Sequence, residues 1–181
     1  MHSFRSIPKR SIIVALSCAT LLAAAESTAF KGRDMGTFTS SPTNNPQVVL
    51  TEDSAAGEAT HLGRYKLSAH ELINLATLDV TEGAFTIAAA NGDTLTGRYS
   101  GKASIETPTI LRYEVSGPIT GGTGRFSEVT GTVAFFGYAD LVSGRLSETL
   151  LGVRANDVEE GRWAVQVWKS LGARLTHRCR S

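Results

Sequence analysis

The feature that most constrains this chain is a series of short segments with apolar side chains on every second residue and turn-forming residues between the segments. Period two is the repeat of a β-strand, because successive side chains point to opposite faces of a sheet. From Phe30 to Val153 the segments recur at roughly the 8–12-residue spacing that is typical of a β-sandwich or β-barrel. No long amphipathic helix and no alternation of strand with helix occurs before residue 155, which argues against an α/β fold. The sequence therefore predicts an all-β domain.

The individual strands are predicted with different clarity. The clearest segments are Phe30–Ser41, Ala59–Leu67, Phe85–Ala90, Ile110–Val115, Val133–Leu141 and Arg145–Val153. Asn91-Gly92 predicts a hairpin, since a type I′ turn needs a positive φ at both central residues.

Three intervening stretches are less regular. Residues 41–47 are rich in Ser, Pro and Asn and predict a loop. Residues 51–57 are polar and small, and we expect Glu52, Asp53 and Glu58 to be solvated. Residues 68–82 leave two structures open, a helical turn or two, or a strand that ends at Val80.

The first 29 residues have the three parts of a secretory signal peptide. A basic, acid-free start is followed by an apolar run over residues 11–25 and then by small residues that offer two cleavage patterns, one directly before Phe30. The run is shorter than the ~20 residues of a membrane-spanning helix. We therefore expect a removed signal at 1–29, a secreted or periplasmic protein, and no membrane span afterwards. A lipoprotein signal at Cys18 is the weaker alternative.

Charge and cysteine content limit the partners. The chain has 18 Lys and Arg against 17 Asp and Glu, a net charge of +1, which gives no reason to expect nucleic acid as a partner. Without the signal, Cys179 is the one cysteine left, so we expect no internal disulfide.

Residues 154–181 form a C-terminal extension whose pattern fits a strand and a helix equally. Its basic charge favours a solvated tail, with an anionic partner or membrane surface as the sharper alternative.

Signatures of several enzyme classes are missing from the sequence. There is no His-Glu-x-x-His pattern and no Cys/His pair with metal spacing, so we expect neither a metal nor a cofactor. There is no Gly-x-Ser-x-Gly elbow, which argues against a serine hydrolase.

A glycine-dense stretch contains the run Gly-Gly-Thr-Gly-Arg-Phe at residues 121–126. This run resembles the GGTGRF turn of dirigent proteins and allene oxide cyclase-like barrels. Residues 60–65, Thr-His-Leu-Gly-Arg-Tyr, resemble a segment of small secreted bacterial proteins with that barrel. The resemblance covers roughly residues 30–153 and implies an eight-stranded antiparallel β-barrel with a central cavity, often as a homo-oligomer. Members of the family isomerise a reactive epoxide or steer the coupling of phenoxy radicals, but their catalytic residues are not matched here.

We interpret the glycine run as structural. Gly121 and Gly122 let the chain turn tightly out of the preceding strand, and Gly124 supplies a further position without a Cβ. Phe126 then folds back as a plug on the end of the barrel. The run is not a phosphate-binding loop, because it lacks the G-x-x-x-x-G-K-[ST] pattern and a following helix.

Three tyrosines and a histidine form the candidate ligand-binding site. His61, Tyr65 and Leu67 share one face of a predicted strand, and Tyr99 and Tyr113 lie on apolar faces of two others. Alternate residues line the inside of a barrel, so these faces would form a pocket for a small apolar molecule with one polar handle. The alternative is that the tyrosines fill the core and bond backbone carbonyls.

These observations lead to three hypotheses of function. The first is a barrel that binds a small hydrophobic ligand or serves as a structural module of the cell envelope. The second is an isomerase or cyclase like the resembled family, which requires an open cavity with an ionisable group at its floor. The third is a partner-binding module that uses the segment after Val153.

Overall fold

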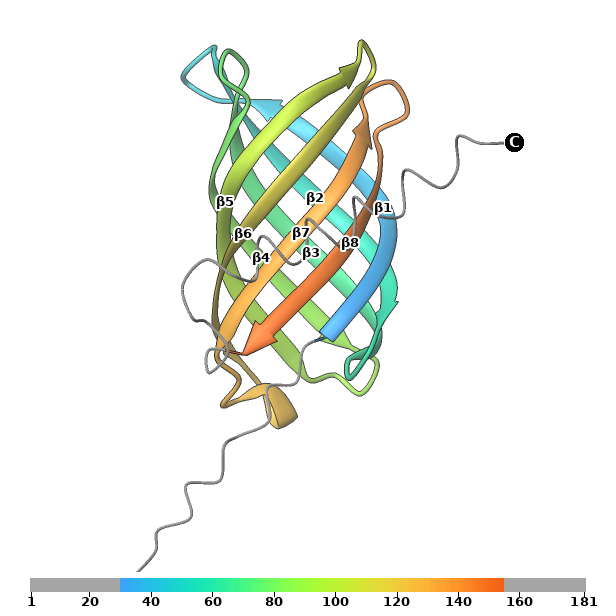
Figure 1. Cartoon of the computed structure of the whole chain (residues 1–181). Coiled ribbons are helices and arrows are strands. Elements are labelled where there is room, and N and C mark those ends of the chain that lie inside the picture. Colours follow the sequence, from blue (N-terminus) through green and yellow to red (C-terminus); the bar gives the residue numbers. More distant parts are fainter. Residues whose placement is uncertain (1–29, 155–181) are drawn as a thin grey trace, which may run out of the picture.

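Eight antiparallel strands form a closed barrel in which neighbours in the chain are neighbours in the sheet and β8 pairs with β1 (Figure 1). The computed structural model describes residues 30–154, so the predictions for the signal peptide and for residues 155–181 lie outside the described residues. The strands are β1 Phe30–Pro42, β2 Val48–Ala59, β3 Gly63–Asn74, β4 Asp79–Ala89, β5 Thr94–Thr107, β6 Ile110–Gly122, β7 Gly131–Asp140 and β8 Arg145–Arg154. The predicted all-β, eight-stranded antiparallel barrel is confirmed.

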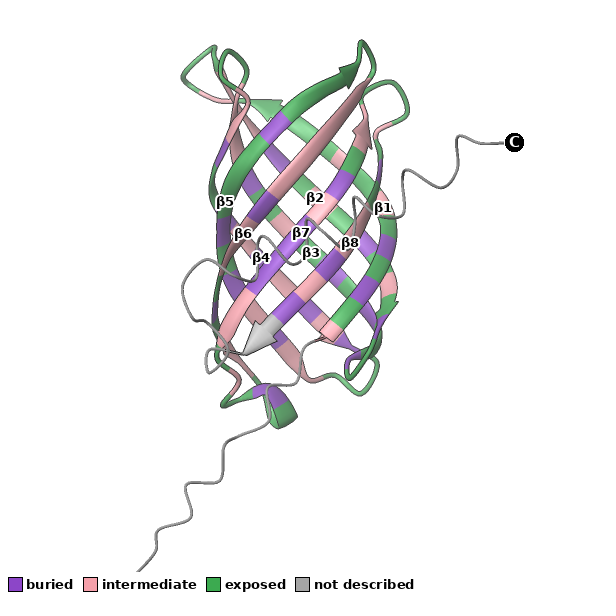
Figure 2. Ribbon diagram, viewed as in Figure 1, coloured by how far each residue is buried: buried purple, intermediate pink, exposed green. Residues whose placement is uncertain are grey.

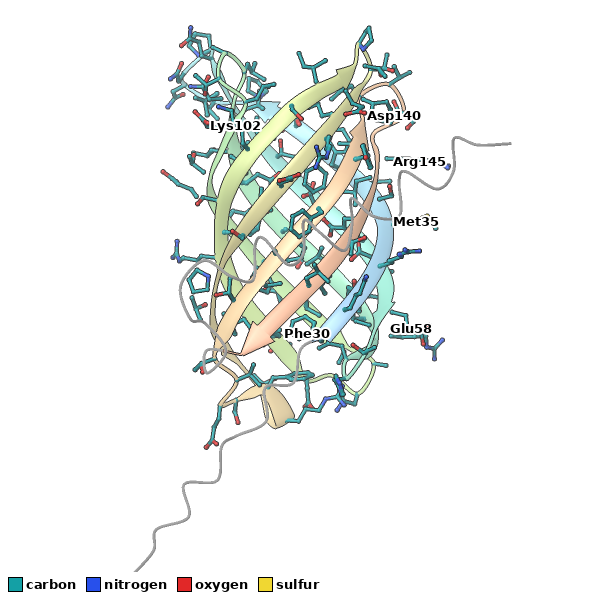
Figure 3. The ribbon with its side chains drawn as sticks, in the orientation of Figure 1. Phe30, Met35, Glu58, Lys102, Asp140 and Arg145 are labelled. Atoms are coloured by element: carbon teal, nitrogen blue, oxygen red, sulfur yellow. The ribbon has the colours of Figure 1, made fainter. Side chains whose placement is uncertain are left out.

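The wall of the barrel follows the period-two pattern of the sequence. In β4, for example, Phe85, Ile87 and Ala89 are buried and alternate with partly exposed residues. The same alternation runs around the barrel as bands of buried and exposed positions (Figure 2). Figure 3 shows the outward positions, with Met35 and Glu58 projecting away from the wall. Burial of each large inward side chain stabilises the fold by about 1.5–3 kcal/mol.

The two ends of the barrel differ. One end, here called the open end, carries the β1–β2, β3–β4, β5–β6 and β7–β8 connections (Figure 1). The other, the closed end, carries the short 3-10 helix η1 Gly124–Phe126. Phe126 is 8% exposed and belongs to the core, and Arg125 donates a hydrogen bond of 2.9 Å to the carbonyl of Leu62. Phe126 is therefore buried at the closed end of the barrel.

The turn that leads to Phe126 lies later in the glycine run than the sequence predicted. Gly121 and Gly122 do not form the turn, because they are the last two residues of β6 and pair with β5. The turn comes later, where Gly124 has φ +54° and a Cβ would stand 1.9 Å from a carboxylate oxygen of Asp93. Glycine adopts this conformation without the penalty of a Cβ and leaves room for the Asp93 carboxylate.

The structure differs from the sequence predictions in two segments and in the type of one turn. Residues 51–57 are not a loop but the middle of β2, and Asp53 faces inward. Residues 68–82 contain no helix: β3 ends at Asn74 and β4 begins at Asp79. The Asn91-Gly92 hairpin is confirmed, although only Gly92 has a positive φ, so the turn is not type I′.

β4 contains an extra residue that hid its pattern. The pairing with both neighbours shifts around Glu82, which has φ +54°. This β-bulge keeps Val80 and Gly83, three residues apart, on the inner face, and so breaks the simple alternation.

Among residues 30–154 no helix is long and apolar enough to span a membrane.

Candidate functional site

A cavity of about 130 Å³ lies inside the barrel, towards the open end. Its wall is mostly apolar and includes Phe38, Leu67, Val80, Val115, Phe135 and Leu146. Leu75, Leu78 and Leu141 line the part of the cavity near the loops. Its size is close to the 150 Å³ of an engineered apolar cavity that binds benzene, and below the roughly 300 Å³ at which drug-sized sites begin.

Aromatic rings form the inner boundary of this cavity. Tyr99 and Phe135 both line it, with their ring centroids 5.7 Å apart. Phe85 packs edge-on against Phe135 at 5.3 Å, in the buried core. Below this layer, towards the closed end, Ile87, Leu95, Val133 and Leu150 are almost completely buried. The barrel is therefore filled at one end and hollow at the other.

Three tyrosine hydroxyls inside the barrel donate hydrogen bonds to carboxylates. Tyr65 bonds Asp34 at 2.5 Å. Tyr99 bonds Glu71 at 2.5 Å, and Tyr113 bonds Glu148 at 2.9 Å. Burial and the neighbouring carboxylates raise the pKa of all three phenols, so they stay protonated and act as donors.

Each pair joins two strands that are separated by a third, and the third strand contributes a glycine. Gly57 of β2 lies between Asp34 and Tyr65 in the register, and Gly137 of β7 lies between Tyr113 and Glu148. Gly83 of β4 lies opposite Tyr99, beside the bulge. A Cβ at these glycines would stand 2.5 Å from the Asp34 Cβ, 2.5 Å from the Tyr113 hydroxyl and 2.4 Å from the Tyr99 ring. The missing side chain therefore lets each phenol reach its carboxylate across the intervening strand.

Two carboxyl groups of the cavity wall have a pKa near neutrality. Burial, together with the charges of Glu71 and Asp34, raises the pKa of Asp53 to about 8. Burial raises the pKa of Glu71 to about 7, although the hydrogen bond from Tyr99 opposes the shift. Carboxyls with such values exchange protons at physiological pH, which is a property of general acids and bases.

Asp34 and Glu148 form a second acidic cluster. They lie directly opposite each other in the β1–β8 register. Burial raises the pKa of both, and the charge of Asp34 raises that of Glu148 further. Oδ1 of Asp34 and Oε1 of Glu148 are buried without a hydrogen-bond partner. Burying a carboxylate oxygen without a hydrogen bond costs free energy. This arrangement therefore favours a proton or a cation between the Asp34 and Glu148 side chains.

The structure brings three of the four predicted site residues to the interior. Tyr99 and Tyr113 line the cavity, whereas Tyr65 is buried but does not line it. Tyr65 and Tyr99 belong to the core, as the alternative expected, but all three hydroxyls bond carboxylates and not backbone carbonyls. His61 does not join them: it lies in the β2–β3 turn, exposed, with φ +64°. The chain leaves β2 at Ala59, two residues before His61, so the alternating face does not extend back to it.

The four interior acids were missed by sequence reasoning. For Glu148 a signal was present, because it lies between Leu146 and Leu150 on the inward alternation of β8. A carboxylate at an inward position of an apolar strand face indicates a buried polar site. For Asp53 the signal was weaker, since its neighbours on the same face are small or polar.

No protein-family model matches the sequence, and no curated protein is significantly similar to it. The fold and the cavity define the described part of the chain as a closed eight-stranded antiparallel β-barrel with an apolar chamber that holds acidic groups. Among residues 30–154, no three His, Cys, Asp or Glu side chains come close enough together to hold a metal ion.

Proposed function

We propose that this protein is a secreted or periplasmic barrel that binds a small hydrophobic molecule in its cavity. The observation that carries the proposal is the apolar chamber with phenol–carboxyl pairs on its wall. Ligand sites are typically concave and apolar with a few convergent polar groups, and this chamber has that composition. The signal-like residues 1–29 support export.

The surroundings of the chamber also support a molecule passing in and out. Leu75, Ile105, Leu141 and Val142 lie near the open end and are 50–79% exposed. Isolated exposed apolar residues are common, but Leu75 and Leu141 also line the chamber itself. Such a rim lowers the cost of bringing an apolar molecule from water into the chamber.

A cavity-filling variant tests the proposal. Ala103 of β5 is 4% exposed and lines the cavity, so Ala103→Leu would occupy part of it. Ala56→Leu, at an exposed outward position of β2, is the matched control. We expect single-ring apolar compounds to shift the NMR signals of the parent and the control, and Ala103→Leu to weaken this binding by about tenfold or more. Binding by none of these compounds, or equal binding by the Ala103→Leu variant, would contradict the proposal.

An isomerase or cyclase is the second candidate function, favoured by Asp53 and Glu71. Both carboxyls line the apolar chamber with pKa values of about 8 and 7, so one can donate a proton while the other accepts one. This arrangement suits the rearrangement of a small unsaturated epoxide, the chemistry that the resemblance to allene oxide cyclase-like barrels implies. The test is whether the protein accelerates the rearrangement of such an epoxide. Loss of this activity in Asp53→Asn and Glu71→Gln, but not in Glu52→Gln, would support the isomerase function. Product formed only at the uncatalysed rate would exclude it.

A further inference from the structure

The wall of the chamber contains acidic side chains but no basic ones. Asp53, Glu71 and Glu148 line it, and none of its lining residues among those described is a Lys, Arg or His. In the strand register, Asp53 lies opposite Phe38 and Ala69, which are apolar and offer no countercharge from their side chains. A buried carboxylate with no cation nearby is unfavourable unless it takes up a proton or a bound cation supplies the positive charge.

The hydrogen bonds inside the barrel leave this need unmet. An ionised carboxylate can accept about four hydrogen bonds. Glu148 receives one, from Tyr113, and its Oε1 is buried without a partner. Oδ1 of Asp34, a residue only 4% exposed, is also unpartnered and lies across the β1–β8 pairing from Glu148. Glu148, which lines the chamber, therefore brings to its wall a buried oxygen that accepts no hydrogen bond.

We infer that the chamber binds a small apolar amine, with the apolar body against the aliphatic and aromatic wall and the ammonium group against a carboxylate of the acidic wall that Asp53, Glu71 and Glu148 form. This inference rests on the ligand-binding function proposed above and adds the chemical class of the ligand. An ammonium group carries several N–H donors and one positive charge, which are the two things that the acidic wall lacks. A cavity of about 130 Å³ limits the body to about one ring.

An organic cation fits the geometry better than a metal ion. A metal ion needs several ligands at once, and no three suitable side chains among residues 30–154 come together. An ammonium group can be held by one carboxylate, while the attached carbon skeleton fills the apolar space that a bare ion would leave empty.

Matched ligands of one size test the inference. We would titrate the protein with phenethylamine, 2-phenylethanol and phenylacetate by calorimetry at about pH 8, where an alkylamine is still protonated. We expect the amine to bind about tenfold or more tightly than the alcohol, and phenylacetate to bind least. Equal affinity for amine and alcohol would overturn the inference and keep the proposed function, whereas binding by none of the three would overturn both.

Isosteric variants identify the groups that select the amine. Asp53→Asn and Glu71→Gln each remove one charge, and Glu52→Gln removes an exposed, outward charge on the same strand as Asp53. We expect the ratio of amine to alcohol affinity to fall by several-fold in the first two variants and to stay constant in the third. Alcohol affinity, which should not change, reports that the chamber is intact. An unchanged ratio in both interior variants would overturn the inference.

The pH dependence provides a second readout. The titratable groups that face the interior are Asp34, Asp53, Tyr65, Glu71, Tyr99, Tyr113 and Glu148. A bound cation favours the ionised carboxyls, so amine binding should release protons and strengthen between about pH 6 and pH 8. Binding of the neutral alcohol should change little over that range. Amine affinity that falls as the pH rises would contradict the proposed site.

Discussion

Glu71→Gln should remove a pH-dependent cost to stability. Glu71 is only 7% exposed, and burial raises its pKa from the ordinary 4.5 to about 7. A carboxyl whose pKa is higher in the folded state binds protons more tightly there, so folding is favoured below pH 4.5 and weakened as the pH rises towards 7. At 1.36 kcal/mol for each pH unit, the loss of unfolding free energy is about 3 kcal/mol.

Urea denaturation followed by far-UV circular dichroism measures this effect at a series of pH values. We expect the parent and Glu71→Gln to have similar stability near pH 4, because the protonated acid and the amide are both neutral. By about pH 8 the variant should be more stable by about 3 kcal/mol. Glu52→Gln, at an exposed outward position, should follow the parent throughout. The reasoning is refuted if Glu71→Gln and the parent lose stability in parallel between pH 4.5 and 7.

Three further predictions concern the structure that surrounds the chamber, each read by chemical denaturation. Phe126→Ala should cost about 3–5 kcal/mol, because it removes the plug of the closed end; a loss below about 1 kcal/mol would mean that the plug is dispensable. Tyr113→Phe should cost about 1–3 kcal/mol by depriving Glu148 of its donor, and no loss would show that the bond is not formed. Gly137→Ala places a Cβ 2.5 Å from the Tyr113 hydroxyl and should cost about 1–3 kcal/mol; a neutral result would contradict the close approach.

Most of the fold could be predicted because it depends on local patterns. The alternation in segments such as residues 64–68 follows from one buried and one exposed face, and turn residues mark the ends. The prediction failed where the pattern was interrupted. Residues 51–57 have inward side chains that are small or acidic, so no apolar alternation is visible there. The bulge at Glu82 changes the spacing of inward residues, and no residue pattern around position 82 indicates a bulge.

The candidate site was predictable only in part. Tyr65, Tyr99 and Tyr113 could be found because each lies on an apolar strand face. Their partners could not, since each bond joins residues 28–35 positions apart that meet only after the barrel has closed. His61 was misplaced because a turn residue continued the alternation of the following strand by chance.

The interior acids make stability and ligand selectivity oppose each other. Apolar residues of similar size in place of buried charges often leave a protein equally stable or more stable, so stability gives no reason for acids at positions 53 and 71. Two glycines, Gly83 and Gly137, and a β-bulge nevertheless accommodate the phenol–carboxyl pairs on this wall. If the acids select a cationic ligand, one cause underlies both effects: the ionised carboxyl that weakens the empty barrel at about pH 8 is the group that a bound ammonium stabilises. Glu71→Gln should therefore gain stability and lose amine preference over the same pH range, and a variant that did only one of these would separate the two roles.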